Sequence, residues 1–352
     1  MADPVVSVLM SVRNGEAYLK EAVDSVLSQD FGDFEFLITD DASTDATPDL
    51  LAAYARRDRR VSVVRERENI GLTVALERMM PRVRGRFIAR MDADDVCLPS
   101  RFRAQVDRFA RDPETGVLSS WFRLILPDGT AFEERCFPDD HAWIRRQLDR
   151  GTNVLSHGTL MFRKEVLDRM TRPVWRFRFG QELDLLLRLL DFTRFGLVPQ
   201  VLYLWRWHTG SMSVAAMQHI RERTDRIICE LHELRSRGLP EYDWRAREQE
   251  ILAAAPTGLG LASAWDDYRQ GRIALFAGKM RAARRSLRAA MVNPKARGKA
   301  LVLFCLACLP AGCGRMAGAL IGRLQWLWNP WAKYIRKLDP AAGTDHLRRG
   351  DA

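Results

Sequence analysis

Cysteine is scarce in this chain of 352 residues, which has six, at positions 97, 136, 229, 305, 308 and 313. Six cysteines scattered over a large chain are typical of free thiols and not of a disulfide framework. Cys305, Cys308 and Cys313 have a C-x2-C-x4-C spacing, which could also serve a zinc site. We favour free thiols, because this run lies in an apolar stretch without a nearby histidine, where a thiol packs as a small hydrophobic side chain.

The sequence also lacks the motifs of several common enzyme classes. No G-x-G-x-x-G follows the first apolar run, no G-x-x-x-x-G-K-[ST] occurs anywhere, and H-E-x-x-H is absent. Dinucleotide-binding and P-loop folds are therefore excluded. If the protein binds a pyrophosphate, a metal ion and basic side chains have to neutralise it in place of a glycine-rich turn.

Neither an export signal nor a long apolar run is evident. Residues 1–4 have no basic region before the first apolar run, so we expect a cytoplasmic protein. The apolar stretch at 300–314 is broken by Pro310 and is shorter than the roughly 20 residues that a membrane span needs. Aromatic and basic residues alternate at 323–337, which suits a bilayer interface. The alternative is a C-terminal helix that packs on its own domain.

Charge is distributed unevenly along the chain. The formal net charge is +10, yet residues 266–352 hold 17 Lys and Arg against 5 Asp and Glu, so the other 265 residues carry a net charge of −2. A basic C-terminal region on a near-neutral body suggests contact with an anionic surface, either a membrane or a nucleic acid. We rank a nucleic acid last, because no nucleic-acid-binding motif occurs.

Strand-like and helix-like patterns alternate over the first hundred residues. Apolar runs that read as strands begin near residues 5, 34, 61 and 87, and residues 16–29 have the apolar spacing of a helix. We also expect a helix with Thr47 as its N-cap and Pro48 in its first turn. Since this repeat matches the size of a strand–helix–strand unit, the sequence predicts an α/β fold with a doubly wound, mostly parallel sheet.

Later segments are more mixed. Strands are expected at 117–126 and 197–204, a helix at 182–190, and a helical C-terminal extension from about residue 217. The stretch 243–265 is ambiguous. Residues 268–294 faintly resemble one tetratricopeptide-like hairpin, but a single copy has no neighbours to cover it, so we expect an ordinary helical pair.

Acidic residues follow two of the predicted strands. Asp40 and Asp41 come after the second strand, and Asp92, Asp94 and Asp95 after the fourth. Ligands of open α/β sheets bind at the carboxyl ends of the strands, so both groups are expected at one edge. Carboxylates this close repel one another unless a cation lies between them. A divalent ion, Mn²⁺ or Mg²⁺, is the simplest cofactor for such a site.

Seven segments, in this order and spacing, resemble the family 2 glycosyltransferases, which have the GT-A fold. They are V-S-V-L-M-S-V-R-N-G at 6–15, D-D-A-S-T-D at 40–45, N-I-G-L at 69–72, A-R-M-D-A-D-D at 89–95, H-G-T-L-M-F-R-K at 157–164, Q-E-L-D-L-L-L-R-L at 181–189 and W-R-W-H at 205–208. The resemblance covers about residues 5–214. It implies an inverting, metal-dependent enzyme that moves a sugar from a nucleotide diphosphate to a hydroxyl group.

The resemblance assigns donor-binding roles to the acidic residues. Asp41 matches the acid that hydrogen-bonds the base of the donor, although an aspartate in a turn can be purely structural. Asp92 and Asp94 match the Asp-x-Asp motif: Asp94 is expected to bind the metal, and Asp92 the ribose or a metal-bound water. Arg90, in the same segment, is assigned to donor binding.

The catalytic base departs from the family pattern. Relatives usually have Glu-Asp where this chain has Gln181 and Glu182, so Glu182 is the expected base, with a side chain one methylene longer. The alternative for Glu182 is a carboxylate that only stabilises a helix N-terminus. Asp184 and His157 are assigned to the acceptor side.

Three basic residues complete the predicted site. Arg13 replaces an aromatic residue of the family and could stack on the base or reach phosphate, or else pair with Asp40 or Asp41. Arg206 matches a late basic motif and is expected at the diphosphate. His208, in the same motif, is assigned as a metal ligand or as a buried structural histidine.

These assignments divide the chain into three parts: residues 1–116 bind the nucleotide sugar, 117–215 bind the acceptor, and 216–352 form a basic helical region that associates with membrane. The expected partners are a nucleotide-diphosphate sugar and a glycan or lipid-linked acceptor in the synthesis of cell-surface polysaccharide or lipopolysaccharide. The expected location is cytoplasmic, peripheral to the inner face of the membrane. A catalytically silent nucleotide-sugar-binding or scaffold protein is the alternative.

Overall fold

The computed structural model describes residues 3–208, 218–253, 271, 275, 280–291 and 294–308. The chain divides into two compact units, Met1–Trp207 with Ile220–Ala255, and His208–His219 with Pro256–Ala352. The first unit therefore extends to residue 255 and includes helices that the sequence pattern assigned to the C-terminal region.

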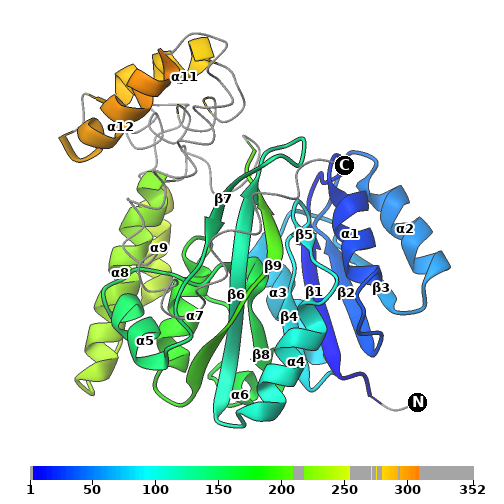
Figure 1. The fold of residues 1–352 in the computed structure, drawn as a ribbon. Coiled ribbons are helices and arrows are strands. Elements are labelled where there is room, and N and C mark those ends of the chain that lie inside the picture. Colours follow the sequence, from blue (N-terminus) through cyan, green and yellow to red (C-terminus); the bar gives the residue numbers. More distant parts are fainter. Residues whose placement is uncertain are drawn as a thin grey trace. The chain divides into compact units, whose positions relative to one another are not determined.

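One nine-stranded sheet forms the centre of the first unit, with helices on both sides (Figure 1). Its main path has the order β3-β2-β1-β4-β8-β6-β9-β5, and β7 pairs with β6. The strands are β1 (Val6–Val12), β2 (Phe34–Asp40), β3 (Val61–Arg65), β4 (Phe87–Arg90), β5 (Val96–Cys97), β6 (Thr115–Ile125), β7 (Ala131–Arg135), β8 (Met161–Arg163) and β9 (Arg194–Arg206).

The N-terminal half of the sheet confirms the predicted parallel strands. β1 pairs in parallel with both β2 and β4, and β2 with β3. Every residue of β2 is buried, as are six of the seven in β1. Such continuous apolar strands are typical of a parallel sheet that is covered on both faces. Their carboxyl ends bring the segments after Val12, Asp40 and Arg90 to one edge.

The other half mixes directions. β8 is antiparallel to both β4 and β6, while the long strands β6 and β9 run parallel to each other. The short strand β5 is antiparallel to β9 and follows the acidic turn directly. The α/β prediction is confirmed, but these antiparallel strands were not foreseen.

Helices connect and cover the strands of the first unit. They are α1 (Leu19–Leu27), α2 (Thr47–Arg57), α3 (Leu72–Met79), η1 (Met80–Arg82), α4 (Arg101–Arg111), α5 (His141–Asp149), η2 (His157–Thr159), α6 (Lys164–Asp168), α7 (Gln181–Leu189), α8 (Gln218–Ser236) and α9 (Trp244–Ala253). The predicted face of α1 is buried at Leu19, Val23 and Val26. The α9 helix resolves part of the stretch that the sequence left ambiguous.

The predicted cap of α2 is wrong. Ala46 is the N-cap, and Thr47 is already helical. The Thr47 hydroxyl accepts a hydrogen bond from the Gly15 backbone at 2.8 Å, while the Asp45 carboxylate accepts the Thr47 N–H at 3.0 Å. Thr47 thus joins α2 to the loop after β1. Pro48 lies in the first turn as predicted.

The described part of the second unit holds two helices, α11 (Met280–Ala290) and α12 (Pro294–Ala307). Ala283, Leu287 and Ala290 are buried on α11, in keeping with a helical pair. Part of the tetratricopeptide-like pattern, Cys313 and the aromatic run at 326–334 lie outside the described residues. The five described cysteines are free thiols. Within the described ranges, none of the helices combines the length and apolarity that a membrane crossing requires.

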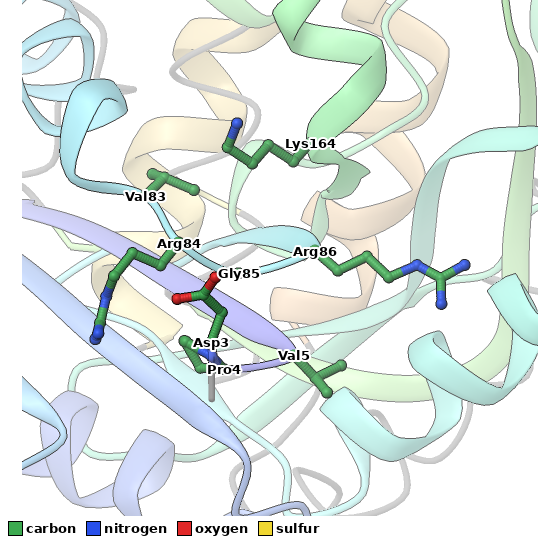
Figure 2. A pocket seen from close by; sticks show the side chains of 8 residues that line it. All are labelled: Asp3, Pro4, Val5, Val83, Arg84, Gly85, Arg86 and Lys164. Atoms are coloured by element: carbon green, nitrogen blue, oxygen red, sulfur yellow. The ribbon is translucent and has the colours of Figure 1, made fainter. Parts of the chain in front are cut away.

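An open hollow of about 580 Å³ lies at the end of the sheet where β1 and β4 begin (Figure 2). Its cationic side chains are already engaged. Arg84 pairs with Glu35 at 2.6 Å, Lys164 pairs with Asp168 at 2.6 Å, and Arg86 lies over the ring of Phe87. This end of the sheet therefore offers little free charge to a ligand.

Candidate active site

The loops after β1 and β2 are joined by backbone-to-side-chain hydrogen bonds. Asn14 donates its N–H to Ser43 Oγ at 2.9 Å, and its side-chain oxygen accepts the Thr44 N–H at 2.8 Å. Asn14 and Ala42 both have positive φ, at 51° and 55°. Non-glycine residues hold such conformations only where their surroundings enforce them, and they cluster at functional sites. The two loops thus form one rigid wall at the carboxyl edge of the sheet.

Asp41 lies in this wall and is almost completely buried. Its Oδ1 accepts the Ile70 N–H at 2.7 Å, and its Oδ2 accepts the Gly71 N–H at 2.9 Å. Gly71 has a φ of +80°, which favours glycine there. Each carboxylate oxygen has a second lone pair, so Asp41 can still accept a hydrogen bond from an N–H group of the nucleotide base. Asp41 also has the structural role that was given as the alternative, because it holds the loop before α3 in place.

Arg90 forms the buried centre of the site. Its guanidinium is completely buried and donates to the Leu9 carbonyl, to His157 Nε2 at 3.1 Å and to Asp92 Oδ1 at 2.9 Å. Since arginine only donates, His157 Nε2 accepts, and the proton of the neutral imidazole is on Nδ1. Arg90 therefore orients Asp92 from behind. Because these N–H groups already have acceptors, Arg90 positions the acidic turn. The sequence pattern had instead assigned it to direct contact with the nucleotide sugar.

The acidic turn after β4 is held by residues of β9. The Asp92 N–H donates to the Tyr203 hydroxyl at 3.2 Å, and the buried Asp95 carboxylate accepts the Arg206 N–H at 2.7 Å. The Arg206 side chain donates from Nε to the Asp94 carbonyl at 2.9 Å. Both aspartates of the Asp-x-Asp motif thus have their backbone held by a strand more than a hundred positions away in the chain.

Arg206 and Arg13, the other two arginines predicted to bind the donor, differ in exposure. Arg206 is 1% exposed, and its guanidinium also contacts the Leu126 and Pro127 carbonyls and Glu21. It is therefore a support for Asp94, and four of the five N–H donors of its guanidinium already have protein acceptors. Arg13 is exposed and has no ion pair with any described residue, so the suggested pairing with Asp40 or Asp41 is not found. Asp40 instead lies 3.4 Å from Arg65.

Glu182 and the acidic turn are brought together although they are ninety residues apart. The pKa of Asp92 is raised to about 6, first by burial and then by the charges of Asp94 and Glu182, while Arg90 acts to lower it. Glu182 also acts electrostatically on Arg90, whose pKa burial lowers. Glu182 is the second residue of α7 and is 9% exposed. The expected base and the expected metal motif therefore share one electrostatic environment.

Asp184, two residues further along α7, lies elsewhere. It is completely buried, and its carboxylate pairs with Arg176 at 2.5 Å and Arg188 at 2.8 Å. An acceptor would have to displace both arginines to reach it. The burial and the two ion pairs indicate a structural role in place of the acceptor contact that the sequence suggested. His157, also assigned to the acceptor side, contacts Trp175 edge-on with 5.6 Å between ring centroids.

The chemistry of the acidic turn fits Mn²⁺ or Mg²⁺. Among the described residues, no three or more His, Cys, Asp or Glu side chains form a preassembled metal cage. Mg²⁺-type sites commonly use one or two carboxylates and complete their shell with water and substrate phosphate. The repulsion among Asp92, Asp94 and Glu182 provides a place for positive charge. His208 follows β9 and belongs to the second unit, so its role as a ligand stays a prediction.

Sequence reasoning missed the residues that hold the site. No motif covers Tyr203, Glu21 or Arg176, and Arg188 was assigned no role although it lies in the segment 181–189. Only their pairing in three dimensions with Asp92, Arg206 and Asp184 reveals them. The one available signal was the uncommon number of arginines in apolar segments, because a buried arginine requires partners.

Comparisons with known proteins agree with this geometry. Residues 7–171 match the model of the family described as Glycosyl transferase family 2. TuaG of Bacillus subtilis strain 168, named as a teichuronic acid biosynthesis glycosyltransferase, is 30% identical over 196 residues, covering 55% of this chain and 76% of TuaG. The chain belongs to glycosyltransferase family 2. Glycosyl transfer from a nucleotide sugar is thus its general activity.

One further relative and two solved structures are also similar to this chain. The O-antigen biosynthesis glycosyltransferase WbnJ of Escherichia coli is 29% identical over 220 residues, or 61% of this chain and 84% of WbnJ. TarS 1–349 of S. aureus in complex with UDP-GlcNAc aligns with a TM-score of 0.54 and 16% identity over 90% of this chain and 92% of TarS. The mannosyltransferase PcManGT of Pyrobaculum calidifontis, in complex with GDP-Man and Mn²⁺, aligns with a TM-score of 0.51 and 18% identity over 91% and 87%. At these identities the likeness shows the GT-A fold alone.

Proposed function

We propose that this protein is an inverting glycosyltransferase, in which Glu182 takes the proton of an acceptor hydroxyl. The observation that carries this proposal is that the charge of Glu182, at the start of α7, acts on Asp92 of the Asp-x-Asp turn and on the buried Arg90 beside it. An inverting reaction needs a base on the face of the sugar opposite the leaving group. Glu182, on a different element from the donor-binding loops, suits that arrangement.

The proposed step moves one bond and one proton. The acceptor oxygen attacks the anomeric carbon, the bond from that carbon to the donor phosphate oxygen breaks, and the leaving nucleoside diphosphate keeps the electron pair. Glu182 accepts the hydroxyl proton. A bound Mn²⁺ or Mg²⁺ would supply Lewis-acid stabilisation of the diphosphate, with Asp94 and Asp92 as its protein ligands. Arg90 and Tyr203 keep Asp92 oriented throughout.

The chain's own side chains also suggest how the donor is held. Asp41 would accept a hydrogen bond from the base, and the exposed Arg13 would stack on the base or pair with a phosphate. The relatives TuaG and WbnJ are named for teichuronic acid and O-antigen biosynthesis. By analogy with these relatives, we propose that the acceptor is a growing glycan or a lipid-linked saccharide of the cell envelope. Residues 1–116 would then bind the donor and 117–215 the acceptor.

Donor turnover tests this proposal. The full-length protein is incubated with a panel of nucleotide sugars and Mn²⁺, and free nucleoside diphosphate is measured. Turnover should be lost in Asp94→Ala and in Glu182→Gln. It should be kept in Glu114→Gln, because Glu114 is exposed and has no role in the proposed site. The anomeric configuration of a transferred sugar, read by NMR, decides whether the reaction inverts.

Two results would argue against it. Donor that stabilises the protein thermally with Mn²⁺ but is never turned over would favour the alternative, a silent nucleotide-sugar-binding protein. A product that retains the donor configuration would exclude Glu182 as a simple base.

We also propose that the C-terminal region contacts an anionic membrane at the inner face. The α11 helix carries four arginines and no acidic residue, and all four are exposed: Arg281, Arg284, Arg285 and Arg288. Co-sedimentation of the full chain with vesicles of phosphatidylglycerol and phosphatidylcholine should exceed that with phosphatidylcholine alone and should weaken with salt. Equal binding to both vesicles would contradict a charge-based attachment.

A further inference from the structure

The segment 172–180, which leads into α7, has an unusual backbone. Phe177 has a φ of +46° and Gly180 a φ of +70°, so two residues lie in the left-handed region within four positions. Phe177 carries a bulky side chain, for which this conformation is unfavourable and needs support from its surroundings. Since Gly180 is the N-cap of α7, the geometry of this segment determines where the helix begins and where Glu182 points.

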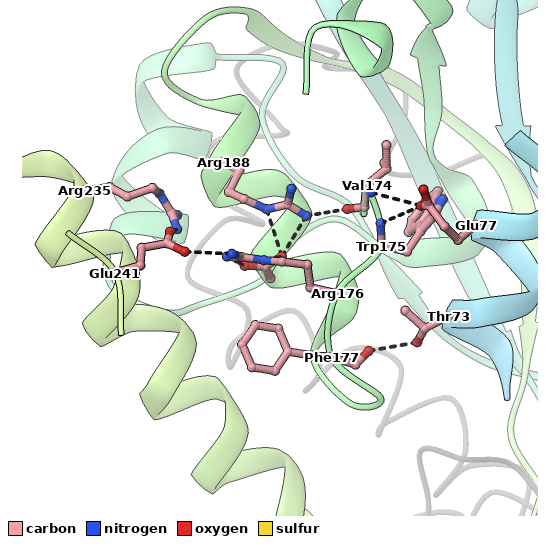
Figure 3. A network of polar contacts seen from close by, with 10 residues as sticks. Thr73, Glu77, Val174, Trp175, Arg176, Phe177, Arg188, Arg235 and Glu241 are labelled. Atoms are coloured by element: carbon pink, nitrogen blue, oxygen red, sulfur yellow. Dashed lines mark hydrogen bonds and ion pairs between the residues drawn. The ribbon is translucent and has the colours of Figure 1, made fainter. Parts of the chain in front are cut away.

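One side of the segment is fastened to α3. The Thr73 hydroxyl donates to the Phe177 carbonyl at 2.8 Å, and Glu77 accepts the N–H groups of Val174 and Trp175 at 3.0 and 3.4 Å (Figure 3). The α3 helix itself follows the loop that Asp41 holds. The segment is thus tied to the donor side of the sheet.

The other side is fastened to the α8–α9 hairpin. Arg176 Nη1 donates to Glu241 at 2.7 Å, and Arg235 of α8 pairs with the same carboxylate (Figure 3). The Phe177 ring lies against Trp244 of α9, with 4.8 Å between centroids. At Gly180, a Cβ atom would lie 2.6 Å from the Asp225 carboxylate, so α8 leaves room only for glycine.

Arg176 joins this hairpin to the catalytic helix. It donates from Nε and Nη2 to the buried Asp184 at 3.1 and 2.5 Å, and Arg188 donates to the same carboxylate at 2.9 Å. Two guanidinium groups therefore face one aspartate, and Glu241 supplies the second negative charge. A removed partner would leave a buried charge unbalanced, which is costly.

Packing alone does not fix this junction. A cavity of about 370 Å³ lies among α3, the segment and α9, and its lining includes Thr73, Trp175, Phe177 and Trp244. Apolar contacts are incomplete around such a space, so the polar contacts have to hold the segment.

We propose that Glu241 and Arg176 are positioning residues for Glu182, and that the α8–α9 hairpin is a brace that sets the start of α7. This inference rests on the proposed role of Glu182 as base. The α8–α9 hairpin lies beyond residues 7–171, which the family model matches.

The test compares two glutamate-to-glutamine changes on the brace. Glu241→Gln keeps the shape but removes the charge that Arg176 and Arg235 share. Glu250→Gln is the matched control, because the ion pair of Glu250 among the described residues is with the exposed Arg247 on α9. For both full-length variants, kcat and the donor KM are measured with Mn²⁺, together with hydrogen–deuterium exchange of peptides covering 172–189 without donor.

Glu241→Gln should lower kcat at least fivefold with the donor KM within twofold of wild type, and should speed exchange in 172–189. Glu250→Gln should match wild type in all three. A second variant, Thr73→Val, removes the support of Phe177 from the other side and should lower kcat in the same way.

Three outcomes overturn the brace: Glu241→Gln behaving as Glu250→Gln does, kcat and donor binding falling together, or unchanged exchange in 172–189. If wild type itself turns over no donor, the proposed function fails, and the exchange measurement still decides whether Glu241 orders the start of α7.

Discussion

Arg90 Nη2 donates to Asp92 Oδ1 at 2.9 Å from a guanidinium that has no solvent exposure. The same side chain reaches back to the Leu9 carbonyl of β1 and across to His157. One arginine therefore joins the central parallel strands, the acidic turn and η2. The planar guanidinium group donates to three partners in different directions, and the ammonium group of a lysine cannot reproduce that geometry.

We expect Arg90→Lys to lower the free energy of unfolding by about 3 kcal/mol, because a buried lysine would leave the Leu9 carbonyl or Asp92 without its partner. Urea denaturation gives this value, and Mn²⁺ titration should show weaker binding because Asp92 is no longer oriented. Arg103→Lys, at a half-exposed arginine that pairs with Asp30, is the control and should stay near wild type. Equal losses in both variants would mean that Arg90 contributes no more than a surface ion pair.

The raised pKa of Asp92, about 6, predicts pH-dependent metal binding. Because the folded protein holds this proton more tightly than an unfolded chain, the ionisation of Asp92 between its ordinary pKa of 3.8 and about 6 destabilises the metal-free fold. A cation binds only the ionised form. The apparent affinity for Mn²⁺ with nucleoside diphosphate should therefore fall about tenfold per pH unit below about pH 6 and level off above it.

Calorimetric titrations between about pH 5 and pH 7.5 measure this slope. Asp92→Asn is the necessary comparison, since the diphosphate titrates in the same range and its share remains in the variant. The slope of wild type should exceed that of Asp92→Asn. Identical slopes would show that no proton leaves Asp92 on binding.

The sequence predicted the part of the fold that long apolar runs encode. All of β2 and six of the seven residues of β1 are buried, and both strands were found from sequence. In contrast, β8 spans three residues and β5 two, too few for any period to be visible. Antiparallel pairing in the second half of the sheet follows from contacts between distant segments, which one sequence does not display.

The same division applies to the site. Asp41, Asp92 and Glu182 were found because a family pattern marks them, and the structure brings Asp92 and Glu182 together. Arg206 and Asp184 belong to the same patterns, yet both are buried in ion pairs with Glu21 and with Arg176. A motif shows which residue types recur, but whether a charge faces the ligand or the core depends on partners that are remote in sequence.

Gly158 is required because η2 lies against the ring of Tyr203. A Cβ atom at position 158 would lie 2.2 Å from the Tyr203 hydroxyl and 2.4 Å from its Cζ. Tyr203 is completely buried and accepts the Asp92 N–H. We expect Gly158→Ala to cost about 1–3 kcal/mol in free energy of unfolding and to weaken Mn²⁺ binding through the displaced turn.

Gly32→Ala is the matched control for this change, because nothing lies within 4 Å of a Cβ atom there. Thermal denaturation of both variants is compared with that of Gly158→Ala combined with Tyr203→Phe. Removing the hydroxyl should recover part of the loss. If Gly158→Ala is as stable as Gly32→Ala, the close approach of η2 to Tyr203 is not a constraint.

Substitutions of Arg13 and Arg206 should affect different properties, namely donor binding for Arg13 and the stability of the protein for Arg206. Arg13 is exposed and unpaired among the described residues, so Arg13→Ala should raise the donor KM about three- to tenfold and leave the melting temperature unchanged. Arg206 supports the Asp94 carbonyl and pairs with Glu21 at 2.5 Å, so Arg206→Lys should lower the melting temperature by several degrees. Activity would then fall through a misplaced Asp94. An Arg206→Lys protein with wild-type stability and a raised donor KM would instead return Arg206 to the diphosphate, as its motif first suggested.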